Sequence, residues 1–356
     1  NNDNYPDIHV SNDFVGPDFL YENQKDGTFK EVAIERLKHT SFYSMGSDVS
    51  DINNDGNFDL FVVDMSFKDY KKSKTSMSMS NRDQFRTLIK YNYNYQYMQN
   101  MLHLGNGEGG FSEVSQLAGI DKTDWSWSSL FVDFDHDGLK DVYITNGIVR
   151  NIIDKDGSKK LAAELKKFKA SGENISQEKI EALMNIFPEA KMTNYIFKNK
   201  DGIKFELKNN KWKSEKPGIT QGACYADFDN DGDLDIIMNN TNAPASLLKN
   251  LASEKRLANS IIIELNNSKT KNYFGIGAIV ELETNGIIQK QFIMANRGYF
   301  SASQSLAHFG IGNTNTIERI TITWPNGKIQ TLKDIKANQK LNIAYEPDNN
   351  MVSKIK

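Results

Sequence analysis

The sequence predicts an all-β protein whose N-terminal part is built from repeats. Short aspartate-rich loops recur along residues 1–252, and each runs directly into large apolar residues that are typical of a buried strand. Each loop is followed by the same order of strand, glycine-containing turn and strand. From about Ser260 the loops stop, and strand patterns joined by the turns TNGI and PNGK begin. Two β architectures in series are therefore expected.

The loop ADFDNDGDLDIIMNN, residues 226–240, shows why a metal ion is expected. Its crowded carboxylates repel one another unless a cation lies between them, and Gly232 permits the sharp turn. Oxygen ligands at the first, third, fifth, seventh and ninth positions favour calcium over zinc or copper. In order, these ligands are Asp227, Asp229, Asp231, the carbonyl of Asp233, and Asp235.

Two other interpretations of this loop are possible. An EF-hand needs a glutamate at the twelfth position and flanking helices, but here Met238 stands at that position and the flank DLDIIM predicts a strand. A single loop of this kind could also be a polar hairpin turn, because turns use Asp, Asn and Gly in any case. Recurrence of the register along the chain favours the metal.

The same register recurs in three further loops. SDINNDGNFDLFVVD offers Asp51, Asn53, Asp55, the carbonyl of Asn57, and Asp59. VDFDHDGLKDVYITN offers Asp133, Asp135, Asp137, the carbonyl of Leu139, and Asp141. NNDNYPDIHVSND begins inside a copy, in which the third, fifth, seventh and ninth positions are Asn1, Asp3, Tyr5 and Asp7. Asn4 replaces the glycine there, which is tolerable because Asn adopts left-handed backbone more readily than most residues.

The repeating unit is close to one four-stranded propeller blade: a lead-in strand, a metal loop and three more strands. Within LGNGEGGF, Gly105, Gly107 and Gly110 match the dinucleotide-binding pattern G-x-G-x-x-G. A strand pattern follows them where such a site requires a helix, so we expect no phosphate site.

These residues carry a resemblance to known families. The loops, written D-x-[DN]-x-D-G-x-x-D, resemble those of FG-GAP/VCBS repeats, the calcium-binding propeller blades also found in integrin α subunits. FGIGAIVELETNG, RGYFSASQSLAHFGIG and ITITWPNGKIQTL resemble the ASPIC/UnbV domain of cartilage acidic protein-like proteins. This order, together with YQYMQNMLHLGNG and TDWSWSSLFVDFDHDGLKD, is similar to large surface proteins of Bacteroidota.

The resemblance implies binding and display at a bacterial outer-membrane surface, in a lipoprotein of a nutrient-uptake or adhesion assembly. Expected partners are other surface or outer-membrane proteins or a glycan, with Ca²⁺ as the bound ion. It supplies no catalytic residues. Four blade signatures precede residue 250, the first cut through its loop, whereas closed propellers have about 4–8 blades. We therefore expect further blades upstream, and the resemblance implies a secretion signal and a lipid anchor before them.

The expected architecture is a partial calcium-binding β-propeller with helical insertions, followed by a β-sandwich-like domain. The propeller blades cover 1–252, with insertions at about 66–100 and 150–192, the ASPIC/UnbV domain covers 253–347, and 348–356 is a tail. Strands are expected at SIIIEL, GAIVELE, IIQKQFIM, ERITITW and KLNIAY, which make a sandwich the natural outcome. Arg297 is either a structural arginine that binds backbone or a ligand-binding one.

The insertions and aromatic pairs leave alternatives open. In the first insertion, Tyr91, Tyr93, Tyr95 and Tyr97 could stack on sugars, pack one face of a strand or anchor the insertion. In the second, KKLAAELKKFKA and SQEKIEALMNIF predict two amphipathic helices, the latter capped by Ser176, that cover the propeller or form a docking surface. An apolar stripe of this kind is most often core. Trp125 and Trp127 either pack between blades or meet a ligand.

Composition excludes several function classes. The chain is 38% hydrophobic and 25% charged, and its net charge of −3 argues against a general nucleic-acid binder. A single cysteine, Cys224, excludes an intramolecular disulfide framework and is expected to be a buried, inert thiol. No apolar run reaches the roughly 20 residues of a transmembrane helix.

An enzyme is the alternative to a binding protein. The five histidines have no H-E-x-x-H or similar zinc spacing, and no G-x-S-x-G elbow occurs. A glycosidase or lyase needs only two correctly separated acids, so a calcium-dependent carbohydrate-active enzyme remains open. The loop aspartates are already explained as metal ligands, which favours a non-catalytic protein.

Overall fold

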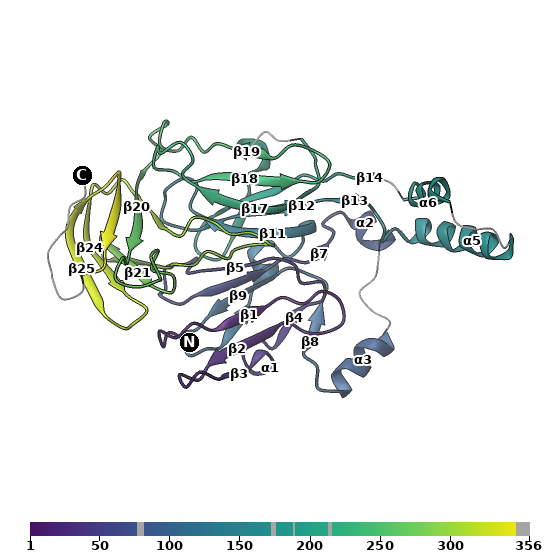
Figure 1. Ribbon diagram of the computed structural model, residues 1–356, viewed down its shortest axis with the longest axis horizontal. Helices are drawn as coiled ribbons and strands as arrows, with labels where there is room; N and C mark the ends of the chain where they lie inside the picture. Colours follow the sequence, from purple (N-terminus) through teal and green to yellow (C-terminus); the bar gives the residue numbers. More distant parts are fainter. Residues whose placement is uncertain (77–81, 172–175, 188, 213–215, 347–356) are drawn as a thin grey trace.

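The computed structural model describes residues 1–76, 82–171, 176–187, 189–212 and 216–346, and the structural statements below concern these residues. The described chain is mostly β (Figure 1). The sheets of the repeat region form the middle of the molecule, a group of later strands forms one end, and helices project at the opposite end. The predicted all-β class with a propeller-like repeat region is confirmed.

Four antiparallel sheets form the repeat region. They contain β1 (Ile8–Val10), β2 (Phe19–Asn23) and β3 (Phe29–Glu31); β5 (Ser47–Ser50), β6 (Asp59–Val62), β9 (Met101–Gly105) and β10 (Phe111–Glu113); β7 (Met65–Ser66), β11 (Asp124–Val132), β12 (Asp141–Asn146), β15 (Tyr195–Asn199) and β16 (Phe205–Leu207); and β17 (Thr220–Ala226), β18 (Asp235–Asn240) and β19 (Ser246–Leu248). The expected four-strand unit is complete in the second sheet and gains β7 in the third.

Each complete aspartate loop connects the first two long strands of its sheet. The residue before the first aspartate pairs with the ninth-position aspartate in every case: Ser50 with Asp59, Val132 with Asp141, and Ala226 with Asp235. The strand after the loop is apolar on both faces because neighbouring sheets cover both, and β6 and β12 are wholly buried. The loops are therefore fixed at one edge of a packed core.

Short elements connect these sheets. β4 (His39–Ser41) pairs in parallel with β8 (Tyr95–Tyr97), and β13 (Ile148–Arg150) pairs with β14 (Glu189–Ala190). The helices are α1 (Ala33–Arg36), α2 (Tyr70–Thr75), α3 (Arg82–Lys90), α4 (Ser115–Ala118), α5 (Lys155–Ser171), α6 (Gln177–Met184) and α7 (Asn209–Trp212). Among the described residues, no helix is long and apolar enough to span a membrane.

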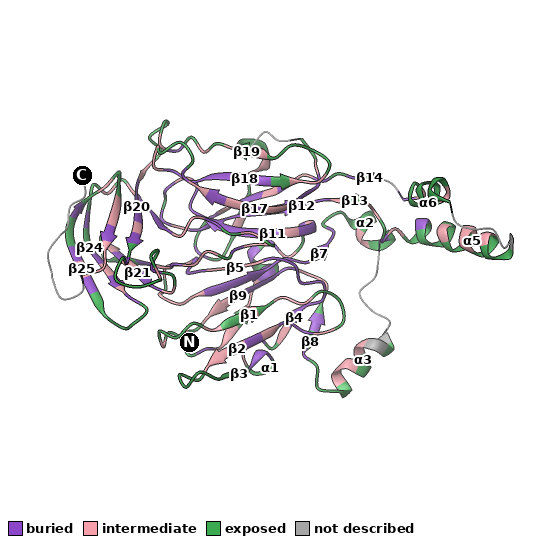
Figure 2. Cartoon of the chain, in the orientation of Figure 1, coloured by how far each residue is buried: buried purple, intermediate pink, exposed green. Residues whose placement is uncertain are grey.

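The second insertion forms the two predicted helices, α5 and α6. Ser176 caps α6, since its hydroxyl accepts a hydrogen bond of 3.2 Å from the backbone N–H of Lys179. The helices project away from the sheets and most of their residues are exposed, with Leu183 the buried residue of α6 (Figures 1 and 2). Covering the propeller and contributing a core stripe are both wrong for this pair, because most of its described residues are exposed and the helices project away from the propeller sheets.

The tyrosines of the first insertion are surface residues that pack on its helix. Tyr95 and Tyr97 lie on β8 with 46% and 39% of their surface exposed. Their ring centroids are 6.1 and 6.3 Å from that of Phe85 on α3. This arrangement favours an anchoring role for these two, and contact with a sugar stays a prediction.

The C-terminal strands form two packed sheets, as predicted. Their orders are β23-β20-β26 and β22-β21-β24-β25. The strands are β20 (Asn259–Asn266), β21 (Ile279–Thr284), β22 (Ile287–Phe292), β23 (Ala307–Gly312), β24 (Thr316–Thr323), β25 (Ile329–Lys336) and β26 (Gln339–Ala344). Asn285 and Gly286, with φ of 51° and 75°, make the tight turn expected at TNGI. One apolar cluster fills the space between the sheets, with Phe309 and Trp324 fully buried in it.

Residues 295–304 attach these sheets to the repeat region. The backbone N–H of Gly298 donates to the carbonyl of Ser47 at 3.0 Å, and that of Tyr299 donates to Oγ of Ser128 at 3.2 Å. Arg297 Nη1 lies 2.6 Å from Asp48 Oδ1, and both side chains are buried. Arg297 therefore holds one strand of the repeat region, which supports its structural interpretation.

The tryptophans pack rather than line an open surface. Trp125 is buried in the largest apolar cluster, and Trp127 lies against Tyr299 with ring centroids 5.0 Å apart. The indole N–H of Trp127 donates to the carbonyl of Gly147 at 2.6 Å. The packing interpretation is therefore supported for both residues. The predicted tail, 348–356, lies outside the described residues.

Candidate metal sites

The four loops share a backbone conformation that the sequence pattern predicts only in part. The sixth position has a positive φ, as predicted from its glycine, and the fourth position has one as well. Values at the fourth and sixth positions are 59° and 65° at Asn2 and Asn4, 58° and 84° at Asn54 and Gly56, 61° and 94° at His136 and Gly138, and 59° and 93° at Asn230 and Gly232. The missed signal was asparagine, which adopts this conformation readily and occupies the fourth position in three loops.

Carboxylates at the first and fifth positions fold the loop onto itself. Oδ2 of Asp133 accepts from the backbone N–H of Gly138 at 2.9 Å, and Oδ1 of Asp137 accepts from that of Leu139 at 3.0 Å. In the loop of residues 51–59, Asp51 accepts from Gly56 at 3.0 Å and Asp55 from Asn57 at 2.8 Å. The seventh residue is thereby held with its N–H turned toward the fifth.

The ninth-position aspartate joins the loop to the next strand of its sheet. Oδ1 of Asp141 accepts from the backbone N–H of Asn199 at 2.8 Å, and Oδ2 accepts from that of Phe134 at 3.0 Å. Asp59 and Asp235 make the same pair of bonds, to Gly105 and Ile52 and to Asn250 and Phe228. Oδ1 of Asp7 makes the bond to the next strand, from Asn23 at 2.9 Å.

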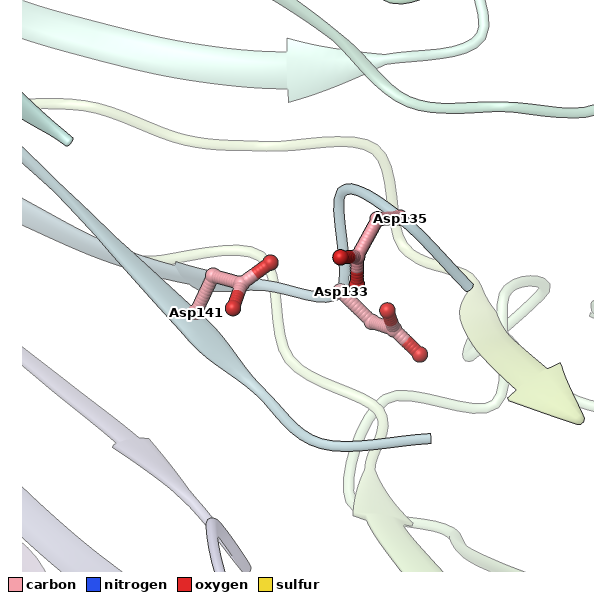
Figure 3. Close-up of side chains that lie close together, drawn as sticks. All are labelled: Asp133, Asp135 and Asp141. Atoms are coloured by element: carbon pink, nitrogen blue, oxygen red, sulfur yellow. The ribbon is translucent and has the colours of Figure 1, made fainter. Parts of the chain in front are cut away.

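Two loops bring three carboxylates together. Oxygens of Asp133, Asp135 and Asp141 lie within 4.8 Å of one another, as do those of Asp227, Asp229 and Asp231. Figure 3 shows the first group, with Asp133 and Asp135 on the loop and Asp141 on the strand that follows.

Orphaned oxygens test whether these residues fit a metal ion. Oδ1 of Asp133 and Oδ1 of Asp135 are buried and accept no hydrogen bond. A buried acceptor without a partner costs about 1–3 kcal/mol, and a cation between the carboxylates removes that cost. The donor set contains only oxygen, so it fits a hard divalent cation such as calcium.

The raised pKa values of these carboxylates indicate that a bound cation would stabilise their charged forms. Burial raises the pKa of Asp133 to about 7, and neighbouring Asp137 and Asp135 add to the effect, although the ammonium of Lys140 opposes it. Burial likewise raises the pKa of Asp51 to about 6 and that of Asp59 to about 7. For Asp141, burial and the charges of Asp133 and Asp135 hold the pKa well above its usual value. The loops are thus unfavourable places for anions unless a cation joins them.

Two lysines at equivalent places supply part of that charge. Lys198 lies on β15, directly before Asn199. Its ammonium group pairs with Asp135 and lies 2.6 Å from a carboxylate oxygen of Asp137. Lys249 precedes Asn250 in the next sheet and pairs with Asp229 at 2.5 Å. Neither lysine was singled out from the sequence, because strand pairing places it beside a loop far away in the chain. A metal ion at either loop has to compete with this ammonium group.

The other two loops are less acidic. In the loop of residues 51–59, Nδ2 of Asn53 donates to Oδ2 of Asp55 at 3.0 Å, so an amide replaces the third-position carboxylate. In the first loop, Asp3 pairs with Lys25 at 3.3 Å. Among the described residues, neither loop gathers three carboxylates within 4.8 Å.

Cys224 differs from its expected burial. Its exposure is intermediate, and partial burial raises the pKa of the thiol. The reason lies in β17, an edge strand whose burial alternates from Ala223 to Ala226, because Cys224 lies on its less covered face. The raised pKa agrees with an inert thiol.

A cavity of about 870 Å³ lies between the first two sheets and the C-terminal sheets. Its lining includes Tyr5, Ile8, Ser47, Arg297 and Phe300. Phe300 is 95% exposed and has a positive φ of 44°. Ile8 of β1 is among the residues that line this cavity.

Comparison with known proteins shows which repeats and domains this chain resembles. A model of the FG-GAP-like repeat matches residues 1–62 and 89–144, and a model described as ASPIC and UnbV matches residues 268–350. Cartilage acidic protein 1 of Xenopus tropicalis is 26% identical over 278 residues, covering 72% of this chain and 42% of that protein. The proteins of the same name from Mus musculus and Homo sapiens are 28% identical over 137 residues, 38% of this chain and 21% and 20% of theirs. The chain thus spans less than half the length of these relatives.

Proposed function

We propose that this chain, which combines FG-GAP-like repeats with an ASPIC/UnbV domain and is homologous to cartilage acidic protein 1, is a non-catalytic, calcium-stabilised binding or scaffold protein. These families are not typical enzymes. The observation that carries the proposal is that the loop carboxylates fall into two groups, one bonded to the backbone and one with buried oxygens that have no hydrogen-bond partner. Ninth-position aspartates satisfy backbone N–H groups, while buried oxygens of Asp133 and Asp135 have no hydrogen-bond partner.

Calcium at the loops has a structural task in this proposal. The ligands in the third sheet are Asp133, Asp135, Asp137, the carbonyl of Leu139, and Asp141, with Asp227, Asp229, Asp231, the carbonyl of Asp233, and Asp235 in the fourth. The ion neutralises the carboxylates and fixes the turn between two strands. Because Asp141 also bonds to Asn199 on β15, an ordered loop stabilises the neighbouring strand as well.

The setting we propose is extracellular, at a bacterial outer-membrane surface, within a nutrient-uptake or adhesion assembly. The homology to cartilage acidic protein 1 supports the extracellular part, and the bacterial surface follows from the resemblance of the sequence to surface proteins of Bacteroidota. Partners are then other surface or outer-membrane proteins.

Calcium can be tested on the purified chain. We expect calcium to raise the melting temperature above its value in chelator, and elemental analysis to find bound calcium. Absence of bound calcium with an unchanged melting curve contradicts the metal proposal, and turnover of a glycan contradicts the non-catalytic one.

A further inference from the structure

The fourth loop differs from the others at its seventh position. There Asp233 stands where the equivalent residues are Tyr5, Asn57 and Leu139. The side chain of Asp233 has no exposed surface, and its Oδ2 accepts from the backbone N–H of Ser253 at 3.0 Å. Its Oδ1 is buried without a hydrogen-bond partner. A fully buried carboxylate with one oxygen that accepts no hydrogen bond raises the free energy of the folded state unless a cation is close to it.

The surroundings of Asp233 provide the other ligands of a cation site. Carboxylate oxygens of Asp231, Asp233 and Glu254 lie within 4.8 Å of one another, and Oδ2 of Asp231 is also buried without a hydrogen-bond partner. Glu254 reaches this place because Ser253, its neighbour in the chain, bonds to Asp233. The group is separate from Asp227 and Asp229, and it shares Asp231 with them.

One ammonium group lies between the two sets of carboxylates. Nζ of Lys249 is 2.5 Å from Asp229 Oδ2, 3.6 Å from Asp231 Oδ2 and 2.5 Å from Glu254 Oε1. The side chain is 45% exposed, so it can turn into solvent without unpacking the core. A single positive charge cannot balance all of these carboxylates, and like charges held this close repel strongly.

We propose that the fourth loop holds two divalent cations of the calcium class, with Asp231 as the bridging carboxylate. One ion takes the repeat ligands, and the second takes Asp231, Asp233 and Glu254. This deepens the proposed function, because it rests on calcium at the loop. Only the fourth loop can hold the second ion, since the other seventh positions carry no carboxylate. Lys249 neutralises the cluster until both ions bind.

Calcium titration of the metal-free full chain by isothermal calorimetry tests this site, with calcium alone as the probe. Glu254→Gln keeps the size of an exposed side chain and should lower the stoichiometry by one calcium per chain. Glu164→Gln is the matched control, because Glu164 is also exposed and paired with a lysine, Lys167, but lies on α5, which projects away from the sheets. Lys249→Gln should tighten calcium binding by at least about fivefold, since it removes a competing charge.

The outcomes separate this site from the calcium proposal as a whole. If wild type binds no calcium, the proposed function fails and the second site with it. If wild type binds calcium, Asp229→Asn loses an ion and Glu254→Gln does not, the repeat site stands and the second site is wrong. Circular dichroism of each variant in chelator shows whether the fold is retained, so that a lost ion reflects a lost ligand.

Discussion

Replacing Asp141 and Asp135 separately distinguishes the structural and metal-binding carboxylates of one loop. In chelator, Asp141→Ala leaves the buried N–H groups of Phe134 and Asn199 without acceptors. Each unpaired donor costs about 1–3 kcal/mol, so the free energy of unfolding should fall by roughly 2–6 kcal/mol. Asp135→Ala should change it by no more than about 0.5 kcal/mol in chelator, because lost repulsion offsets the lost Lys198 pair.

Calcium should make Asp135→Ala destabilising as well, without changing the order of the two effects. At roughly ten times the dissociation constant, one site adds about 1.4 kcal/mol to wild-type stability, and Asp135→Ala should lose that increment. Urea unfolding followed by tryptophan fluorescence, with and without calcium, measures both quantities. An Asp141→Ala protein as stable as wild type in chelator refutes the reasoning, as does an Asp135→Ala protein that has lost several kcal/mol there.

Three further results are expected. Without calcium, burial raises the pKa of Asp133 to about 7, above its unfolded value, so the folded state binds more protons than the unfolded state. The melting temperature should therefore fall as the pH rises from 5 to 8, and added calcium should raise it most at pH 8. Arg297→Met should cost about 3–5 kcal/mol in urea unfolding because it leaves Asp48 buried and unpaired, and adding Asp48→Asn should recover part of the loss. Asp64→Ala should cost roughly 2–4 kcal/mol by thermal melting, because that buried carboxylate accepts from two backbone N–H groups.

The repeat could be read from the sequence because its signals are local. A glycine at the sixth position and an apolar run after the ninth fix the turn and the strand, and the register of Asp141 with Val132 follows from them. Asn230 and its equivalents carried a second local signal, a positive φ at the fourth position, which is weak because asparagine is common in every kind of turn.

Other parts of the site depend on distant residues and left no local signal. Lys198 lies about sixty residues after the aspartates it contacts, and Arg297 reaches Asp48 across most of the chain. Their positions follow from the order of the sheets and the docking of the C-terminal sheets. The exposure of α5 and α6 was missed for a related reason, since an amphipathic pattern shows that a face is apolar without showing whether anything packs on it.

The electron density of crystals grown with calcium or soaked with terbium tests the central claim most directly, because anomalous scattering locates a bound ion among its ligands. The account predicts peaks between Asp133, Asp135 and Asp141 and between Asp227, Asp229 and Asp231, with the ninth-position aspartates still bonded to backbone N–H groups. Fully formed loops without a peak at either place, in crystals that contain the metal, would contradict it.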